Sequence, residues 1–161
     1  MMVALALGGL VMLVAVPGLW GILQRSRLDA AVRHMVADLH DARSQAITTG
    51  WEYRIVGFDS GSSLNANQYR LLARNSSSAS WPADDAAPML SSTQYAGSWV
   101  RIDSMYPGVN LDYTSPRFEL TFDSRGTAAG AAANFNPLRL IGHDGDEARV
   151  QVSVVGGITV Q

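Results

Sequence analysis

The sequence predicts an α+β fold in which one long N-terminal helix packs on a small antiparallel β domain. The first 23 residues are apolar, and residues 24–49 carry an apolar stripe at helical spacing. After Gly50 the pattern changes to short, often alternating segments that are bounded by turn-forming residues. The chain therefore divides into an apolar half-helix (1–23), an amphipathic half-helix (24–49) and a globular β domain (50–161).

The apolar run, residues 1–23, is long enough to cross a bilayer, which requires about 20 apolar residues. A cleaved secretory signal fits less well, because no basic residue precedes the run and no small-x-small site follows it. Gly8 and Gly9 allow close helix–helix approach, Pro17 removes one helical hydrogen bond, and Trp20 suits a membrane interface or a helix contact. These four residues are the candidate membrane and assembly positions.

The amphipathic half-helix continues the apolar run without an interrupting Gly or Pro between Ile22 and Thr49. Its apolar stripe recurs at spacings of 4, 3, 4, 3 and 4, and consists of Leu28, Val32, Met35, Leu39, Ala42 and Ala46. We expect Leu28, Val32, Met35 and Leu39 to pack the helix against the chain's own domain. Gly50 is expected to end the helix as its C-cap.

The β domain is expected to contain about seven strands of an antiparallel sheet. The segments are 51–58, 68–74, 98–102, 109–113, 117–122, 137–142 and 148–155. The Ser/Ala/Pro-rich segment 75–97 and the segment 126–136 are expected to be irregular surface loops. The Asp144–Gly145 pair predicts a hairpin turn between the last two strands.

Three stretches carry a resemblance to a known family. They are the apolar helix with Gly9 eight residues before Pro17, continued by LQRSRLDAAVRHMVADLHDARSQAITTG (23–50); FDSRGTA (122–128); and VQVSVVGGITV (150–160). The chain resembles the GspH/FimT family of type IV pilin-like minor pseudopilins. The resemblance implies a pilin-like fold and a structural, non-enzymatic subunit of a type II secretion or type IV pilus filament.

The resemblance also implies a location and partners. It places the chain in the bacterial inner membrane as a single-pass protein, with the C-terminal domain in the periplasm before assembly into a filament. Other pilin or pseudopilin subunits would contact its N-terminal helix, and secreted cargo or tip subunits would contact its domain. Arg25 and Arg27 follow the apolar run, so the positive-inside rule alone would put the domain in the cytoplasm.

Two features depart from the family pattern. Pilin-like precursors carry a leader and a G-F-T-L-I-E-type motif, are cut after the Gly and are methylated. Alignment through Gly9 and Pro17 places that Glu just before Met1, which indicates either a misassigned start or a leaderless variant. The tail GGITVQ (156–161) lacks the arginines of family members that bind DNA, so DNA is not an expected partner. A DNA-binding minor pilin for DNA uptake and a non-polymerising membrane-anchored binding domain are the alternatives.

Composition and motifs predict no cofactor, metal or catalytic site. The net charge is −2, which gives no general basic field for nucleic acid, and the absence of cysteine excludes disulfides and thiolate sites. The chain has no H-E-x-x-H, G-x-S-x-G or phosphate-loop pattern. His34 and His40 are six residues apart, which puts them on different helical faces.

Some charged and aromatic residues admit both a functional and a structural interpretation. HDGDE (143–147) concentrates carboxylates, but its Asp-Gly turn favours a hairpin over a calcium loop. Asp84 and Asp85 are expected to be solvated, and Trp51, Trp81 and Trp99 to anchor the core or loops. Scattered, solvated positions are likewise expected for five arginines, which are Arg101, Arg117, Arg125, Arg139 and Arg149.

Overall fold

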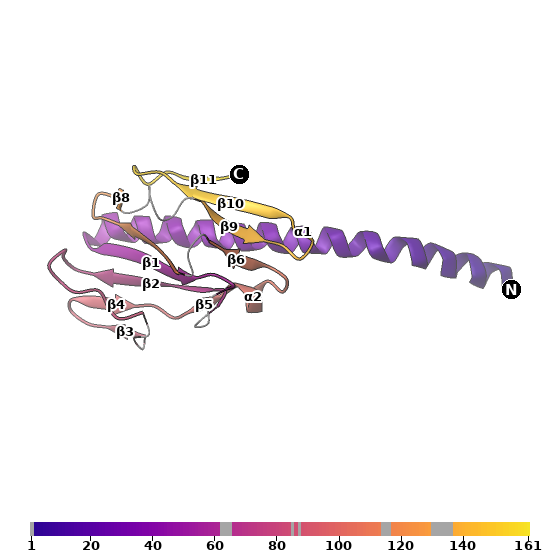
Figure 1. Cartoon of the computed structure of the whole chain (residues 1–161), viewed down its shortest axis with the longest axis horizontal. Helices are drawn as coiled ribbons and strands as arrows, with labels where there is room; N and C mark the ends of the chain where they lie inside the picture. Colours follow the sequence, from indigo (N-terminus) through magenta and orange to yellow (C-terminus); the bar gives the residue numbers. More distant parts are fainter. Residues whose placement is uncertain (1, 62–65, 85, 87, 114–116, 130–136) are drawn as a thin grey trace.

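The computed structural model describes the backbone of residues 2–61, 66–84, 86, 88–113, 117–129 and 137–161 (Figure 1). It describes the side chains of these residues from Gly21 onward, except Met89 and Leu90. Within this part of the chain, a long helix lies between two antiparallel sheets along its second half. The α+β class predicted from the sequence is confirmed.

Helix α1 spans Met2–Thr49. Figure 1 shows its first half projecting beyond the sheets, whereas its second half lies against them. The helix ends as predicted, because Gly50 adopts φ +73° and its N–H donates to the Ala46 carbonyl over 3.0 Å. Among the residues whose side chains are described, no helical stretch is long and apolar enough to span a membrane. Residues 1–20 of the apolar run lie outside that part of the chain.

The larger sheet is built around three well-paired strands. Strand β1 (Glu52–Phe58) pairs with β2 (Gln68–Arg74) on one side and with β7 (Arg117–Phe122) on the other. The sheet is extended by shorter strands, which are β3 (Met89–Leu90), β4 (Gln94–Ala96), β5 (Val100–Arg101) and β8 (Ala128–Ala129). The order is β3-β4-β2-β1-β7-β8, and β5 also pairs with β2.

The smaller sheet follows a short helix, α2 (Ile102–Met105). Its strands are β6 (Asn110–Asp112), β9 (Leu138–Ile141), β10 (Glu147–Val152) and β11 (Ile158–Val160), in the order β11-β10-β9-β6. The turn between β9 and β10 is the predicted hairpin, since Arg139 and Arg149 face each other and Gly145 has φ +81°.

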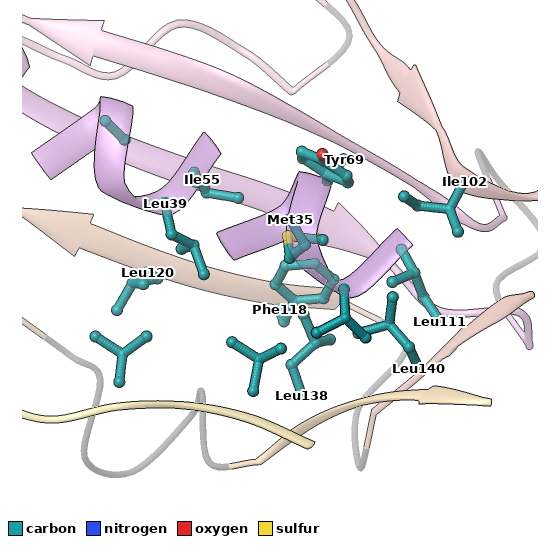
Figure 2. Close-up of a cluster of buried hydrophobic side chains, with 14 of the residues drawn as sticks. Met35, Leu39, Ile55, Tyr69, Ile102, Leu111, Phe118, Leu120, Leu138 and Leu140 are labelled. Atoms are coloured by element: carbon teal, nitrogen blue, oxygen red, sulfur yellow. The ribbon is translucent and has the colours of Figure 1, made fainter. Parts of the chain in front are cut away.

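The hydrophobic core forms where the inner faces of both sheets meet α1. Figure 2 shows Met35 and Leu39 of α1 close to Phe118 and Leu120 of the larger sheet and Leu138 of the smaller sheet. All five side chains are buried. Because α1 supplies the apolar surface that both sheets cover, its second half is part of the domain's core and not an addition to it.

Close packing in this core also explains a glycine in the middle of β1. A Cβ atom at Gly57 would lie 2.1 Å from Cζ of Phe118, a residue of the neighbouring strand. Gly57 therefore allows the Phe118 ring to lie over the strand backbone.

The main strands agree with the sequence prediction to within three residues at each end, but the layout of the domain differs from it. The expected single sheet is two sheets, and segment 75–97 contains the β3–β4 hairpin. Segment 98–102 forms only the two-residue strand β5 before α2 begins, while β8 and β11 are additional. A strand of two or three residues is too short to show alternation of apolar and polar residues. Whether it forms depends on the strand with which it pairs. Residues 130–136 of the second expected loop lie outside the described residues.

Candidate functional site

The helical stripe expected to hold the helix on the domain is buried. Met35 and Leu39 are 0% exposed, and Leu28 and Val32 are each 6% exposed. All four belong to the core cluster that contains residues of both sheets. The opposite side of the same helix carries exposed residues such as Arg33 and Ala37.

The four candidate membrane and assembly residues, Gly8, Gly9, Pro17 and Trp20, belong to the backbone of α1. Their side chains lie outside the described residues. The next apolar positions along the helix are Ile22 and Leu23, which are 68% and 45% exposed.

Polar contacts join the second half of α1 to the domain. Near its projecting half, Arg25 Nε lies 3.0 Å from Asp146 Oδ2 in an exposed ion pair. Further along, Asp38 accepts a hydrogen bond from the hydroxyl of Tyr69 on β2. Burial and this bond raise the pKa of Tyr69, so the phenol remains a donor.

At the other end of the helix, Arg43 joins the three sequence stretches quoted above. Its Nε donates to the Gly126 carbonyl over 3.0 Å, and its Nη2 donates to the Val155 carbonyl over 3.2 Å. The two loops also bond directly, since Ala128 N–H donates to the Val154 carbonyl over 2.9 Å. We call this cluster the Arg43 junction: Arg43, Gly126 with the turn before it, and the turn 153–156.

Two glycines are required by the tight packing of the Arg43 junction. Gly126 has φ +74° and Gly156 has φ +78°, a conformation that other residues rarely adopt. A Cβ atom at Gly156 would lie 2.1 Å from the Gly126 carbonyl oxygen and 2.7 Å from Arg43 Nε. Only hydrogen fits at this position without displacing the arginine or the facing loop.

The turn before Gly126 is organised by Asp123. Its Oδ1 accepts hydrogen bonds from the N–H groups of Arg125 and Thr127, each over 2.9 Å, and its Oδ2 accepts from the Thr127 hydroxyl over 2.7 Å. Burial tends to raise the pKa of Asp123, but these hydrogen bonds outweigh it, so its pKa lies below the ordinary value.

We expect Asp123→Ala to destabilise the domain by about 1 kcal/mol at pH 7, the usual cost of removing a side chain that caps backbone N–H groups. Because the pKa of Asp123 is lowered by folding, its contribution is present above the ordinary aspartate pKa and is lost as pH falls through the lowered pKa. Urea unfolding of wild type and variant at pH 7 and at decreasing pH measures this.

The control for this prediction is Asp144→Ala, which removes a carboxylate from the exposed β9–β10 turn. It should change stability by no more than about 0.5 kcal/mol. A gap between wild type and Asp123→Ala that stays constant down to acid unfolding would contradict the proposed role of the carboxylate.

On the outer face of the larger sheet, residues of segment 75–97 are held by arginines. The guanidinium groups of Arg54 and Arg74 both contact the Trp81 ring, with their Cζ atoms 4.1 Å and 4.5 Å from the ring centroid. Asp84 accepts hydrogen bonds from Arg117 over 2.7 Å and 3.2 Å, so the expectation that Asp84 is solvated was wrong. Its partner is 33 residues away, which no local pattern could indicate. Asp85 lies outside the described residues.

Four of the five arginines expected to be scattered and solvated form ion pairs, and those of Arg101 and Arg149 remain exposed to solvent. Arg117 also bonds Glu119, Arg101 pairs with Asp103, Arg139 pairs with Asp112, and Arg149 pairs with Glu147. These arginines do lie apart, but carboxylates neutralise them. In the part of the chain that the structure describes, they do not combine into a basic patch of the kind that binds a phosphate backbone.

The described residues include no group of three or more His, Cys, Asp or Glu side chains that could hold a metal ion. The carboxylates of 143–147 belong to the hairpin turn, where the Gly142 N–H donates to the Asp146 carbonyl over 2.7 Å. The distinctive arrangement is therefore a helix fastened to a double-sheet domain, with the Arg43 junction at one end.

Comparison with known proteins gives one family and one kind of solved structure. The family model described as type II transport protein GspH matches residues 31–156, a range that contains Arg43, Gly126 and Gly156. No curated protein matches the chain.

The solved structures are of the type IV minor pilin FimU of Pseudomonas aeruginosa (strain PAO1) in two crystal forms. The first is 16% identical with a TM-score of 0.53, and the match covers 85% of this chain and 90% of that one. The second is 16% identical with a TM-score of 0.51, and the match covers 83% and 92%. At this identity the likeness concerns the fold, which is the pilin fold.

Proposed function

Because the chain belongs to the GspH family of type II transport proteins, we propose that it is a structural minor pseudopilin or pilin subunit of a secretion or pilus filament. The observation that supports this most is the continuity of α1. One helix runs from Met2 to Thr49, with its second half in the core of the domain and its first half projecting from it (Figure 1).

In this proposal the apolar half-helix, residues 1–23, anchors the subunit in the inner membrane, with the β domain in the periplasm. On assembly it leaves lipid and packs beside the corresponding helices of other pilin or pseudopilin subunits. This exchange has a low free-energy cost, because lipid chains and neighbouring helices are similarly apolar. Gly8, Gly9 and Pro17 would allow close approach, and Trp20 would sit at the interface.

The fastened half of α1 has a mechanical role in this proposal. The buried stripe and the Arg43 junction couple the helix to both sheets, so a pull on the projecting half is transmitted to the whole domain. The domain would then present its surface to tip subunits or secreted cargo. This is a structural and non-enzymatic role.

The first test is the intact mass and the N-terminal peptide of the protein purified from its native membrane. We expect a chain cut after a Gly just upstream of Met1, with a methylated N-terminal residue. This result would support a subunit that is processed for assembly. An unmodified N-terminus at Met1 would contradict that proposal and favour a membrane-anchored binding domain that does not polymerise.

A further inference from the structure

Part of the larger sheet's inner face extends beyond the helix that covers the rest. Helix α1 packs mainly on β1 and β7 of this sheet and on the smaller sheet. Beside it, toward β2 and β4, lies a groove of about 490 Å³. Its lining comes from α1 (Asp41, Gln45, Thr49), from Trp51 and Tyr53, and from Leu71 and Tyr95.

A second hollow of about 190 Å³ continues this groove toward Val100. It shares Asp41, Leu71 and Tyr95 with the first and adds Asp38 and Tyr69. We call the two together the Trp51 groove. Its helical side runs from Asp38 to Thr49, which at 1.5 Å per residue is about 16 Å, the length of about five extended residues.

The walls of the Trp51 groove combine aromatic rings with carboxylates. Trp51, Tyr53 and Tyr95 supply the rings, and Asp38 and Asp41 lie on the helical side. No residue lining the two hollows is basic. Asp41 accepts one hydrogen bond from Gln45 Nε2 over 2.6 Å and is exposed, so it keeps acceptor capacity toward the groove.

The same chain shows elsewhere what such a combination binds. At Trp81, Arg74 lies over the indole and also pairs with Glu52 at 2.6 Å. Trp99 shows the cation–π contact, with the Arg70 guanidinium 5.0 Å from the ring centroid, while Arg70 Nη1 donates to the backbone carbonyls of Asp84 and Ala86. An indole next to a carboxylate holds a guanidinium through cation–π attraction and charge-assisted hydrogen bonds. Among the described residues, no arginine or lysine lines the Trp51 groove to fill this place.

We infer that the Trp51 groove is a docking site for an arginine side chain carried on a short segment of a partner protein. The guanidinium stacks on Trp51 and Tyr95 and pairs with Asp41, while apolar neighbours of the arginine cover Leu71. The groove's charge complements this occupant, since its lining carries two carboxylates and no arginine or lysine. Asp38 already accepts from Tyr69 and lies 3.7 Å from His34 Nε2, so Asp41 is the carboxylate that pairs with the guanidinium. This inference does not depend on filament assembly.

The test uses the full chain in a non-ionic detergent, with the indole N–H signals of its tryptophans followed by NMR. The probe is the peptide acetyl-Gly-Leu-Arg-Leu-Gly-amide, and its twin carries citrulline, a neutral isostere, in place of arginine. The arginine peptide should shift the Trp51 indole signal in a saturable way, with a dissociation constant of about 1 mM. The signals of Trp81 and Trp99, which already have arginine neighbours, should stay in place and report an intact fold.

Removal of the charge on the peptide's guanidinium or on Asp41 should weaken binding about five-fold or more. We therefore expect this loss with the citrulline twin and with Asp41→Asn. The matched control is Asp29→Asn, which removes an exposed carboxylate on the same helix outside the groove and should bind as wild type does. The inference is overturned if the arginine peptide does not shift the Trp51 indole signal, or if the citrulline peptide binds as tightly as the arginine peptide. It is also overturned if Asp41→Asn and Asp29→Asn lose affinity to the same extent. These outcomes are independent of N-terminal processing, which is the test of the proposed function.

Discussion

Replacement of Leu39 by aspartate is expected to unfold the whole domain and not merely to release the helix. Leu39 is 0% exposed and lies among side chains of both sheets (Figure 2). Loss of a buried leucine costs about 2–5 kcal/mol, and an unpaired carboxylate in its place adds several kcal/mol more. A domain of this kind is stable by only about 5–15 kcal/mol in total. Urea unfolding of the full chain in detergent, followed by tryptophan fluorescence, measures the effect.

The matched control is Ala37→Asp, which places the same side chain on the exposed side of the same helix. It should cost no more than about 0.7 kcal/mol, the difference in helix propensity. A β domain of wild-type stability in Leu39→Asp would contradict the packing, because it would mean that the two sheets form a core without the helix.

The burial of Leu39 could be predicted from the sequence because the signal for it is local. A stripe at spacings of 3 and 4 fixes one face of a helix wherever that helix lies, and burial of that face follows. The same holds for the strands around Ile55, Leu72 and Leu120, whose alternating or β-branched residues need no knowledge of their partners. The helix and the central strands were therefore predictable within a few residues.

Features that depend on tertiary pairing could not be predicted in this way. Strands β3, β4 and β8 have two or three residues each. The longer strands β2 and β7 offer pairing edges to β4 and β8, and β4 in turn pairs with β3. The residues of the Arg43 junction come from three separate stretches of the sequence, and only the fold brings these stretches into contact. The Trp51 groove likewise depends on how much of the sheet α1 covers, and no residue pattern in α1 predicts that.

The second large effect is expected at the Arg43 junction. Gly156→Ala should destabilise the domain by about 2.5–5 kcal/mol. Adoption of positive φ by alanine costs about 1–2 kcal/mol. The rest arises because the new Cβ would lie 2.1 Å from the Gly126 carbonyl oxygen, so the turn must withdraw from Arg43. The Val155 carbonyl then loses its hydrogen bond to this charged donor, which is worth about 1.5–3 kcal/mol.

Gly145→Ala separates these two contributions. Gly145 has nearly the same backbone conformation, φ +81°, but no atom lies within 4 Å of the position its Cβ would take. This variant should lose only the stability that corresponds to the cost of positive φ, about 1–2 kcal/mol. Replacement of glycine by alanine also lowers the entropy of the unfolded chain, but this gain is the same in both variants and cancels in their difference. The difference between their unfolding free energies therefore measures the packing of the junction alone. Equal losses would mean that the turn 153–156 can leave Arg43 without cost, and the helix would then be held at this end by its apolar stripe and by the Arg43–Gly126 hydrogen bond.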